Sequence, residues 1–258
     1  MKPKVVVYVF PGTNSEHETK RALEDSGVDV ALVRSDDRTS AAKNADGYVL
    51  PGGFAHEDRI RAGAVAAHDR AMDVVIEAAQ KGKPVLGICN GAQVLLESGL
   101  VPGTSSARRP SAAFAPNLPG GRFRCVHVHV RLMIPPARSA LLSALPNDAV
   151  IPAWVAHGEG RLAASFDELA RVEREHLAFV YSAPDGETGP EFVPNGSALG
   201  AAALINKAGN VLAIMPHPER DAWAYMHRYD LVSAKTAQEA LQPSGGITFF
   251  RSFAKAFA

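Results

Sequence analysis

The segment Gly87-Ile88-Cys89-Asn90-Gly91 places one of only two cysteines in the 258-residue chain between two glycines. Its G-x-nucleophile-x-G spacing is typical of a sharp turn from a strand into a helix, where small neighbours allow the nucleophile a strained conformation. At the start of that helix the dipole would favour a thiolate at Cys89. The N–H of Asn90 would face an oxyanion formed by attack on a carbonyl. A buried structural cysteine fits the segment equally well.

A histidine and a glutamate two residues apart offer the base that a thiolate nucleophile needs. They are His217 and Glu219, which lie in the segment MPHPER, where prolines keep the backbone extended after an apolar strand. A His-x-Glu pair on its own is more often part of a polar loop. Together with Cys89 it predicts a Cys-His-Glu triad, in which His217 is the base and Glu219 orients it.

Two glycines follow another apolar run in the segment Pro51-Gly52-Gly53-Phe54. Glycines at a strand end let the backbone approach a ligand and present N–H groups to it. Gly53 is therefore a candidate for the second oxyanion donor. By itself, a glycine pair of this kind is more often a plain turn.

Three further histidines carry weaker signals. His127 and His129 share one face of a predicted strand. No third ligand lies near them in the sequence, so the pattern predicts no metal site. His157 lies in AHGEG, a polar segment flanked by glycine that fits either a turn or a second binding loop.

Alternating strands and helices must position these residues. Strands are predicted at residues 5–10, 30–33, 48–50 and 85–88, and helices at residues 16–26, 69–81 and 90–98. Continuous apolar strands separated by helices predict an α/β fold with a doubly wound, mainly parallel sheet and helices on both faces. Ligands of such sheets bind beyond the carboxyl ends of the strands, so the segments after Phe10, Leu50 and Ile88 should meet.

The second half of the chain is less regular and predicts antiparallel additions to the sheet. A long strand is expected at residues 122–132, a hairpin at 201–205 and 211–215, and a closing helix at 246–258. Stretches rich in proline and glycine predict loop insertions near residues 101–121 and 182–196. We expect residues 1–258 to form a single domain.

Composition limits the classes of partner. Lys and Arg together number 27, as do Asp and Glu, so the charge balance indicates neither a nucleic acid nor an acidic membrane as partner. No apolar run approaches the roughly 20 residues that span a bilayer. Two cysteines cannot form a disulfide framework, which fits a reducing compartment. These features predict a soluble, cytoplasmic protein.

Taken in order, these segments resemble the class I glutamine amidotransferases, whose triad is Cys, His and Glu. GICNG and MPHPER are shared by that class. FPGTN, LPGGF followed by RAGA, AHGEGR and PNGS narrow the resemblance to the amidotransferase subunits of phosphoribosylformylglycinamidine synthase, which serve de novo purine biosynthesis. The matching segments run from about Val5 to Arg220 and so cover most of the chain.

The resemblance implies hydrolysis of glutamine to glutamate. Cys89 would attack the side-chain amide, His217 would protonate the departing ammonia, and water would hydrolyse the glutamyl thioester. His157 would contact either glutamine or a partner. The residues that the resemblance places around the substrate are Gly52, Gly53, Asn90 and Gln93.

The resemblance also implies partners. Ammonia would pass to a larger synthetase subunit, which uses ATP and Mg²⁺ to convert formylglycinamide ribonucleotide to the amidine; in many bacteria a small third subunit joins. The chain has no phosphate-loop motif, so no cofactor is expected on it. It departs from the family at Ser15, where cysteine is common, and at Ala55-His56-Glu57-Asp58, where Ser-Tyr-Gly-Asp is common. The alternatives are an amidotransferase for another acceptor, a cysteine hydrolase and a non-catalytic module.

Overall fold

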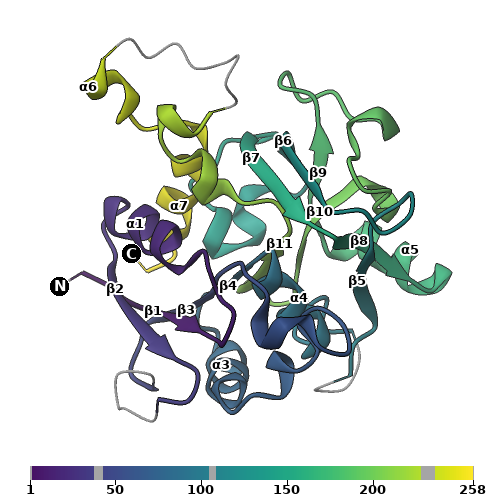
Figure 1. Ribbon diagram of the computed structural model, residues 1–258, viewed down its shortest axis with the longest axis horizontal. Coiled ribbons are helices and arrows are strands. Elements are labelled where there is room, and N and C mark those ends of the chain that lie inside the picture. The colour runs from purple at the N-terminus through teal and green to yellow at the C-terminus, as the bar shows by residue number, and fades with distance from the viewer. Residues whose placement is uncertain (1, 38–42, 105–108, 228–235, 258) are drawn as a thin grey trace.

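Four parallel strands form the first half of a nine-stranded sheet in the computed structural model, which describes residues 2–37, 43–104, 109–227 and 236–257. Helices cover both faces of this sheet (Figure 1). Both faces of its inner strands are therefore buried, which is why these strands are continuous apolar runs. In spatial order the strands are β2 (Asp29–Arg34), β1 (Lys4–Val9), β3 (Gly47–Leu50) and β4 (Val85–Ile88). One face carries α1 (Glu16–Asp25) and α7 (Gly245–Lys255), and the other carries α3 (Ala71–Gln80) and α4 (Asn90–Glu97).

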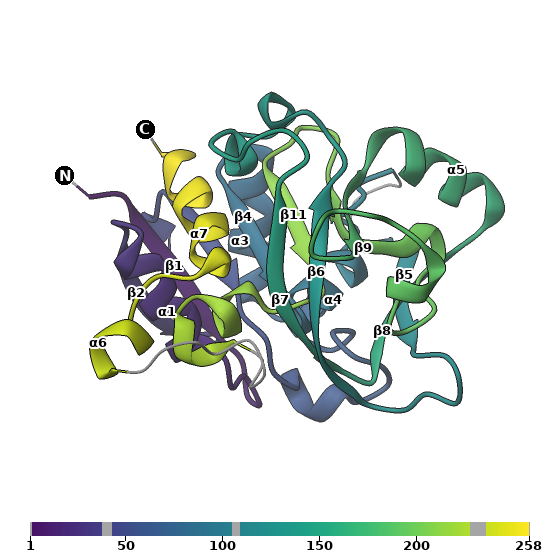
Figure 2. The ribbon, with the colours of Figure 1, turned by 90° about the horizontal axis from the view of Figure 1, so that it is seen from above.

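The second half of the sheet is antiparallel apart from its first strand, β11 (Val211–Ile214), which runs parallel to β4. Beyond β11 follow β10 (Ala201–Ile205), β9 (Leu177–Ser182), β6 (Arg124–Leu132) and β7 (Val150–His157). A separate two-stranded sheet joins β5 (Ala112–Pro116) to β8 (Glu159–Ala164) on the side of α5 (Phe166–Glu175), as Figure 2 shows. The last short helix, α6 (Ala237–Ala240), precedes α7. Within the described residues no helix is both long and apolar enough to cross a bilayer.

The predicted fold class is confirmed, and most predicted elements end within two residues of the observed ones. The closing helix is shorter than predicted, because α7 ends at Lys255; residue 258 lies outside the described part. The predicted loop at 101–121 is wrong in part, since it contains β5; its residues 105–108 are outside the described part. β5 is mostly alanine, which favours strands weakly, and it forms through its pairing with β8.

The turn between β4 and α4 has the strained geometry that the two glycines predicted. Cys89 has φ 50° and ψ −107°, outside the common backbone regions for a residue with a side chain. A Cβ on Gly91 would lie 1.9 Å from the carbonyl oxygen of Leu50, and one on Gly87 would lie 2.6 Å from the oxygen of Gly91. Both flanking residues must therefore be glycine, because the helix leaves the sheet with no space between the backbones.

The segments after the parallel strands meet, as expected. The N–H of Phe54 donates to Gly12 (2.9 Å), and the N–H of Asn14 donates to Gly52 (3.2 Å). The N–H of Cys89 donates to Ile214 (2.8 Å), the last residue of β11. One edge of the sheet thus collects three chain segments that are far apart in sequence.

Candidate active site

Cys89 lies at the wall of a cavity of about 290 Å³ at the carboxyl ends of the strands. It is a free thiol, 4% exposed, and its Sγ is 3.8 Å from the carbonyl oxygen of Ala156 in β7. α4 begins at the next residue, so the thiol faces the positive end of the helix dipole. A nucleophile that is covered by protein yet open to one cavity can be reached by a small substrate only.

His217 and Glu219 lie beside Cys89, because β11 and β4 are neighbouring parallel strands. Two backbone hydrogen bonds hold His217 against Trp154. The N–H of His217 donates to the carbonyl oxygen of Trp154 (2.8 Å), and the N–H of Trp154 donates to the carbonyl oxygen of His217 (3.2 Å). Its Nδ1 is 2.5 Å from Oε1 of Glu219, which is fully buried. The side chain of Cys89 is close enough to the imidazole to raise its pKa. The structure therefore brings all three predicted triad residues together.

The charge of this cluster favours a protonated imidazole. Burial alone would lower the pKa of His217, but the carboxylate of Glu219 and the negative charge on Cys89 outweigh it and raise that pKa to about 9. At neutral pH His217 is therefore an imidazolium beside Cys89. An imidazolium in this position can give a proton to a leaving group.

The glycine pair fits closely around this cluster. A Cβ on Gly52 would lie 2.4 Å from Cε1 of His217, so only glycine leaves the imidazole its position. Gly53 lines the cavity and has φ 152°, a conformation that favours glycine. Asn90 is the first residue of α4, and helix geometry leaves its N–H without an intrahelical acceptor.

The side chains of Asn90 and Gln93 link the segments of the cavity wall by hydrogen bonds. Asn90 accepts from the N–H of Ala55 (2.9 Å) and donates to Asp58 (3.1 Å) and to Gln93 (2.9 Å). Gln93, which lines the cavity, donates to the carbonyl oxygen of Glu159 (2.5 Å). These bonds occupy most of the polar atoms of both amides, so both residues shape the cavity through the protein contacts they make.

Two carboxylates in the cavity wall were not among the predicted site residues. Burial and the nearby charge of Glu159 raise the pKa of Asp58 to about 6. Glu159 also accepts from the N–H of Ala62 (3.2 Å) through Oε2. In the sequence, the segment that contains Asp58 departs from the family, and the segment that contains Glu159 fits a polar turn. It did not show that the two carboxylates face one cavity.

His157 is a buried neutral imidazole in the same wall. It is the last residue of β7, and the tight turn to β8 also lines the cavity, so the AHGEG segment is both a turn and part of the site. Burial and the charge of His217 lower the pKa of His157 to about 3. Neither ring nitrogen has a hydrogen-bond partner among the described residues. Both are buried polar atoms with unused hydrogen-bonding capacity.

The two departures from the family have local explanations. Ser15 is buried and accepts a hydrogen bond from Arg220 at 2.9 Å, next to the triad. Glu57 occupies a position where glycine is common and has φ 61°, with His56 and Asp58 also left-handed (54° and 52°). For residues other than glycine this conformation costs on the order of 1–2 kcal/mol each. The loop is held in place by the side chain of Asn90, which accepts from the N–H of Ala55 and donates to Asp58.

The structure gives His127 two unexpected neighbours. Its ring is edge-on to the ring of His129, with centroids 5.1 Å apart, as the shared strand face predicted. It also meets Asp221 and His227, which come from the far end of the chain.

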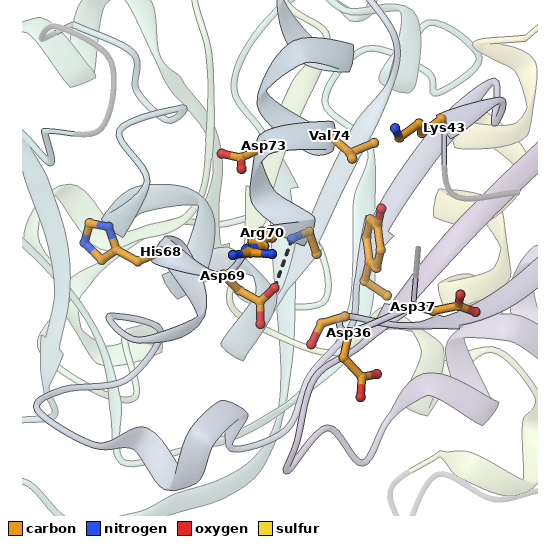
Figure 3. Close-up of a pocket in the computed structure, with 11 residues that line it drawn as sticks. Asp36, Asp37, Lys43, His68, Asp69, Arg70, Asp73 and Val74 are labelled. Carbon is orange, nitrogen blue, oxygen red and sulfur yellow. Dashed lines mark hydrogen bonds between the residues drawn. The ribbon is translucent and has the colours of Figure 1, made fainter. Parts of the chain in front are cut away.

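A larger cavity, of about 770 Å³, lies at the ends of β1 and β2 and the start of α3 (Figure 3). It has no lining residue in common with the Cys89 cavity. Asp36 and Asp37 line one side, and Asp69 and Asp73 the other, with Asp69 bonded to the N–H of Ala71 (2.9 Å). No cysteine is among the described residues that line this cavity, and Cys89 lines the smaller one, so the chemistry is assigned to the smaller one.

Comparisons with known proteins agree with this geometry. The family described as "CobB/CobQ-like glutamine amidotransferase domain" matches residues 2–255. The chain is 38% identical over 227 residues to phosphoribosylformylglycinamidine synthase subunit PurQ of Pyrococcus furiosus, covering 88% of the chain and 93% of that relative. For the protein of the same name from Salinibacter ruber the identity is 40% over 221 residues, with 85% and 88% covered.

Two solved structures have the same fold. A chain in the structure of PurLQS from Thermotoga maritima matches with a TM-score of 0.73 and 28% identity, and 98% of each chain is covered. The glutaminase domain of Trypanosoma brucei CTPS, with bound acivicin, matches with a TM-score of 0.55 and 16% identity, covering 99% of this chain and 94% of that one. The second likeness concerns the fold alone.

The raised pKa of His217 predicts the effect of Glu219→Gln. Removing the carboxylate charge should lower the pKa of His217 from about 9 by roughly one to three units. The measurement is an NMR titration of the His217 ring, assigned by its loss in His217→Ala. Glu24→Gln, on the exposed surface of α1, is the control and should leave that pKa unchanged. An equal pKa in Glu219→Gln and wild type would contradict the assigned cause.

The same shift has a consequence for stability. The folded-state pKa of His217 lies above the value of about 6.5 in an unfolded chain. Its contribution to the free energy of unfolding is therefore fully present below pH ~6.5 and is lost as pH rises through about 9. Denaturant unfolding across this range should show a smaller loss in Glu219→Gln than in wild type.

Proposed function

The chain belongs to the family of CobB/CobQ-like glutamine amidotransferase domains, and we propose that Cys89, His217 and Glu219 are its catalytic triad. Its function is that of the PurQ glutaminase, which supplies ammonia for formylglycinamidine ribonucleotide synthesis in purine biosynthesis. The observation that carries the assignment of the triad is the contact of His217 with both Cys89 and Glu219 at the strained turn after β4.

Each triad residue has a defined task in the proposed reaction. The thiolate of Cys89 attacks the side-chain carbonyl carbon of glutamine, and the N–H groups of Asn90 and Gly53 stabilise the resulting oxyanion. The imidazolium of His217 gives its proton to the nitrogen, and the carbon–nitrogen bond breaks to release ammonia. A water molecule, deprotonated by His217, then attacks the thioester, releasing glutamate and restoring the thiolate. Glu219 holds the imidazole in place and stabilises its positive charge.

The acidic wall of the cavity suits the amino-acid end of glutamine. The α-ammonium group of the substrate is a compact cation, and Asp58 and Glu159 place two carboxylates in the same cavity as Cys89. The raised pKa of Asp58 reflects its burial and the nearby charge of Glu159, and a cation between the two carboxylates would relieve their repulsion. We propose that this pair selects a free amino acid over an amide without a positive charge.

An apolar rim around the cavity suits a protein partner. Four large side chains on two bordering segments are exposed: Phe54 (46%), Ile60 (88%), Leu118 (52%) and Phe123 (55%). Phe54 and Phe123 also line the cavity itself. Exposed apolar side chains gathered at one place mark interaction surfaces, and the Thermotoga structure is of a PurLQS complex. We propose that the rim docks on the synthetase subunit, which binds ATP and Mg²⁺ and receives the ammonia.

We also infer that the described chain acts as one domain. The nine-stranded sheet takes strands from both halves of the sequence, and α7 packs against α1 at the other end of the chain. The inference predicts a single unfolding transition observed by all probes. Two separated transitions would contradict it.

The nucleophile is tested by Cys89→Ala, with the second cysteine as its control. Glutamate release from glutamine, measured with the synthetase subunit, its nucleotide substrate and ATP, should fall at least about 10³-fold in Cys89→Ala. Cys125→Ser should keep wild-type rates, because Cys125 is exposed and outside the triad. Normal turnover in folded Cys89→Ala would exclude the proposed chemistry.

The ammonium contact is tested by Asp58→Asn, which keeps the shape of the side chain and an acceptor for Asn90. KM for glutamine should rise at least about tenfold, the usual effect of losing one charged hydrogen bond, with a smaller change in kcat. Wild-type KM should also rise as pH falls through about 6, where Asp58 takes up a proton. Asp36→Asn, which makes the same charge change in the other cavity, should leave KM unaltered. Equal KM values for wild type and Asp58→Asn would refute the contact.

The docking surface is tested by Ile60→Glu. A charge at this exposed position should weaken binding to the synthetase subunit at least about tenfold, because it would be buried without a partner. Alkylation of Cys89 by iodoacetamide reports that the site is intact and should not change. Phe166→Glu replaces an equally exposed side chain at the start of α5, away from the rim, and should bind normally. Unchanged affinity in Ile60→Glu would remove the rim from the interface.

A further inference from the structure

We propose that His127, Asp221 and His227 bind a divalent transition-metal ion such as Zn²⁺. His127 lies in β6, Asp221 ends the short 3-10 helix Pro218–Asp221, and His227 follows a second one, Ala224–Met226. One ligand atom from each residue lies within 4.8 Å of the other two. None of the three belongs to the triad, so the inference does not depend on the proposed chemistry.

Asp221 is a buried carboxylate that favours a cation nearby. Its side chain is fully buried, yet the ion pairs recorded for it in the described part of the chain are with His127 (2.6 Å) and His227 (2.9 Å). Neither a lysine nor an arginine is among them. A buried carboxylate without a nearby positive charge is strongly unfavourable. A cation in this cluster, either a protonated histidine or a metal ion, would stabilise that charge.

The hydrogen bonds of Ser244 fix the tautomer of His227. The Ser244 hydroxyl donates its one proton to Oδ1 of Asp221 (2.7 Å), so at 2.9 Å it must accept from Nε2 of His227. In a neutral imidazole protonated at Nε2, Nδ1 carries a lone pair. That lone pair faces the Asp221 carboxylate at 2.9 Å and 3.1 Å. Two acceptors this close repel each other unless a cation lies between them.

The donor atoms and the residues around them match those of known types of metal site. Two imidazoles and one carboxylate are the donors that Zn²⁺ accepts, with a water molecule in the fourth position. The side chain of His227 is 27% exposed, which leaves a path for that water. Ser244 bonds both to the second nitrogen of His227 and to Asp221, as outer residues do around metal-bound histidines. Tetrahedral zinc ligands lie roughly 3.3 Å apart, so the donor atoms of His127 and Asp221, which are 2.6 Å apart, would separate by roughly 0.7 Å. His127 would carry its proton on Nδ1.

A metal here would tie three separate parts of the chain together. It would join β6 to the segment that carries Glu219 and, through Ser244, to the start of α7. The ring of His127 also packs edge-on against Trp154, with centroids 5.3 Å apart, and the backbone of Trp154 pairs with His217. The expected effect is on stability, because the ion would hold segments that are otherwise linked only by hydrogen bonds.

The test measures Zn²⁺ binding to the full chain after removal of metal by a chelator. The protein carries Cys89→Ala and Cys125→Ser, which remove both thiols as competing ligands. Isothermal titration should give one Zn²⁺ per chain, and Zn²⁺ should raise Tm by several degrees. Co²⁺, used as a spectroscopic probe, should give the absorption of a nitrogen- and oxygen-ligated site.

His227→Gln is the decisive variant, because a partly exposed side chain can be replaced without unfolding the chain. It should weaken Zn²⁺ binding at least about 100-fold and abolish the rise in Tm. His17→Gln, at an exposed position in α1, should behave as wild type. No stoichiometric binding, or equal binding in His227→Gln, would overturn the proposal. A His227 ring that NMR shows to be an imidazolium and unaffected by Zn²⁺ would assign the cation to a proton instead.

Discussion

The parallel pairing of β4 with β11 is the interaction on which the site depends. β4 ends one residue before Cys89, and β11 ends three residues before His217. The bond from the N–H of Cys89 to Ile214 continues the sheet by one residue, so the register of two buried strands sets the separation of thiol and imidazole. Because a slip of one residue would turn every side chain to the opposite face, the hydrophobic core and the chemistry require the same register.

Charges around the site are arranged in two groups with different tasks. Near His217 they are paired, so that the imidazolium is stabilised by the carboxylate of Glu219. Across the cavity, Asp58 and Glu159 repel each other and are suited to a cation that enters with the substrate. His157 stays neutral, because its burial and the nearby positive charge of His217 both disfavour its protonation. The proposed substrate, a zwitterionic amino acid with its amide directed to the thiol, fits this distribution of charge.

Much of the fold could be predicted because its signals are local. Apolar runs, glycines at strand ends and the spacing around Cys89 each depend on a few neighbouring residues, and the fold class followed from their order. β5 was missed because an alanine-rich strand has little preference of its own. Asp58 points into the cavity only through a left-handed loop held by Asn90. The pairing of His127 with Asp221, 94 residues later, has no local signal at all.

The position of β11 also has a consequence for the synthesis of the chain. This strand fills the middle of the sheet, between β4 and β10, although it is among the last elements in the sequence. Until it leaves the ribosome, β4 and β10 each present an unpaired edge, and exposed edges invite pairing with other chains. Cys89 is synthesised long before His217, so an incomplete chain has the thiol without the imidazole. The proposed triad can form only once β11 has paired with β4.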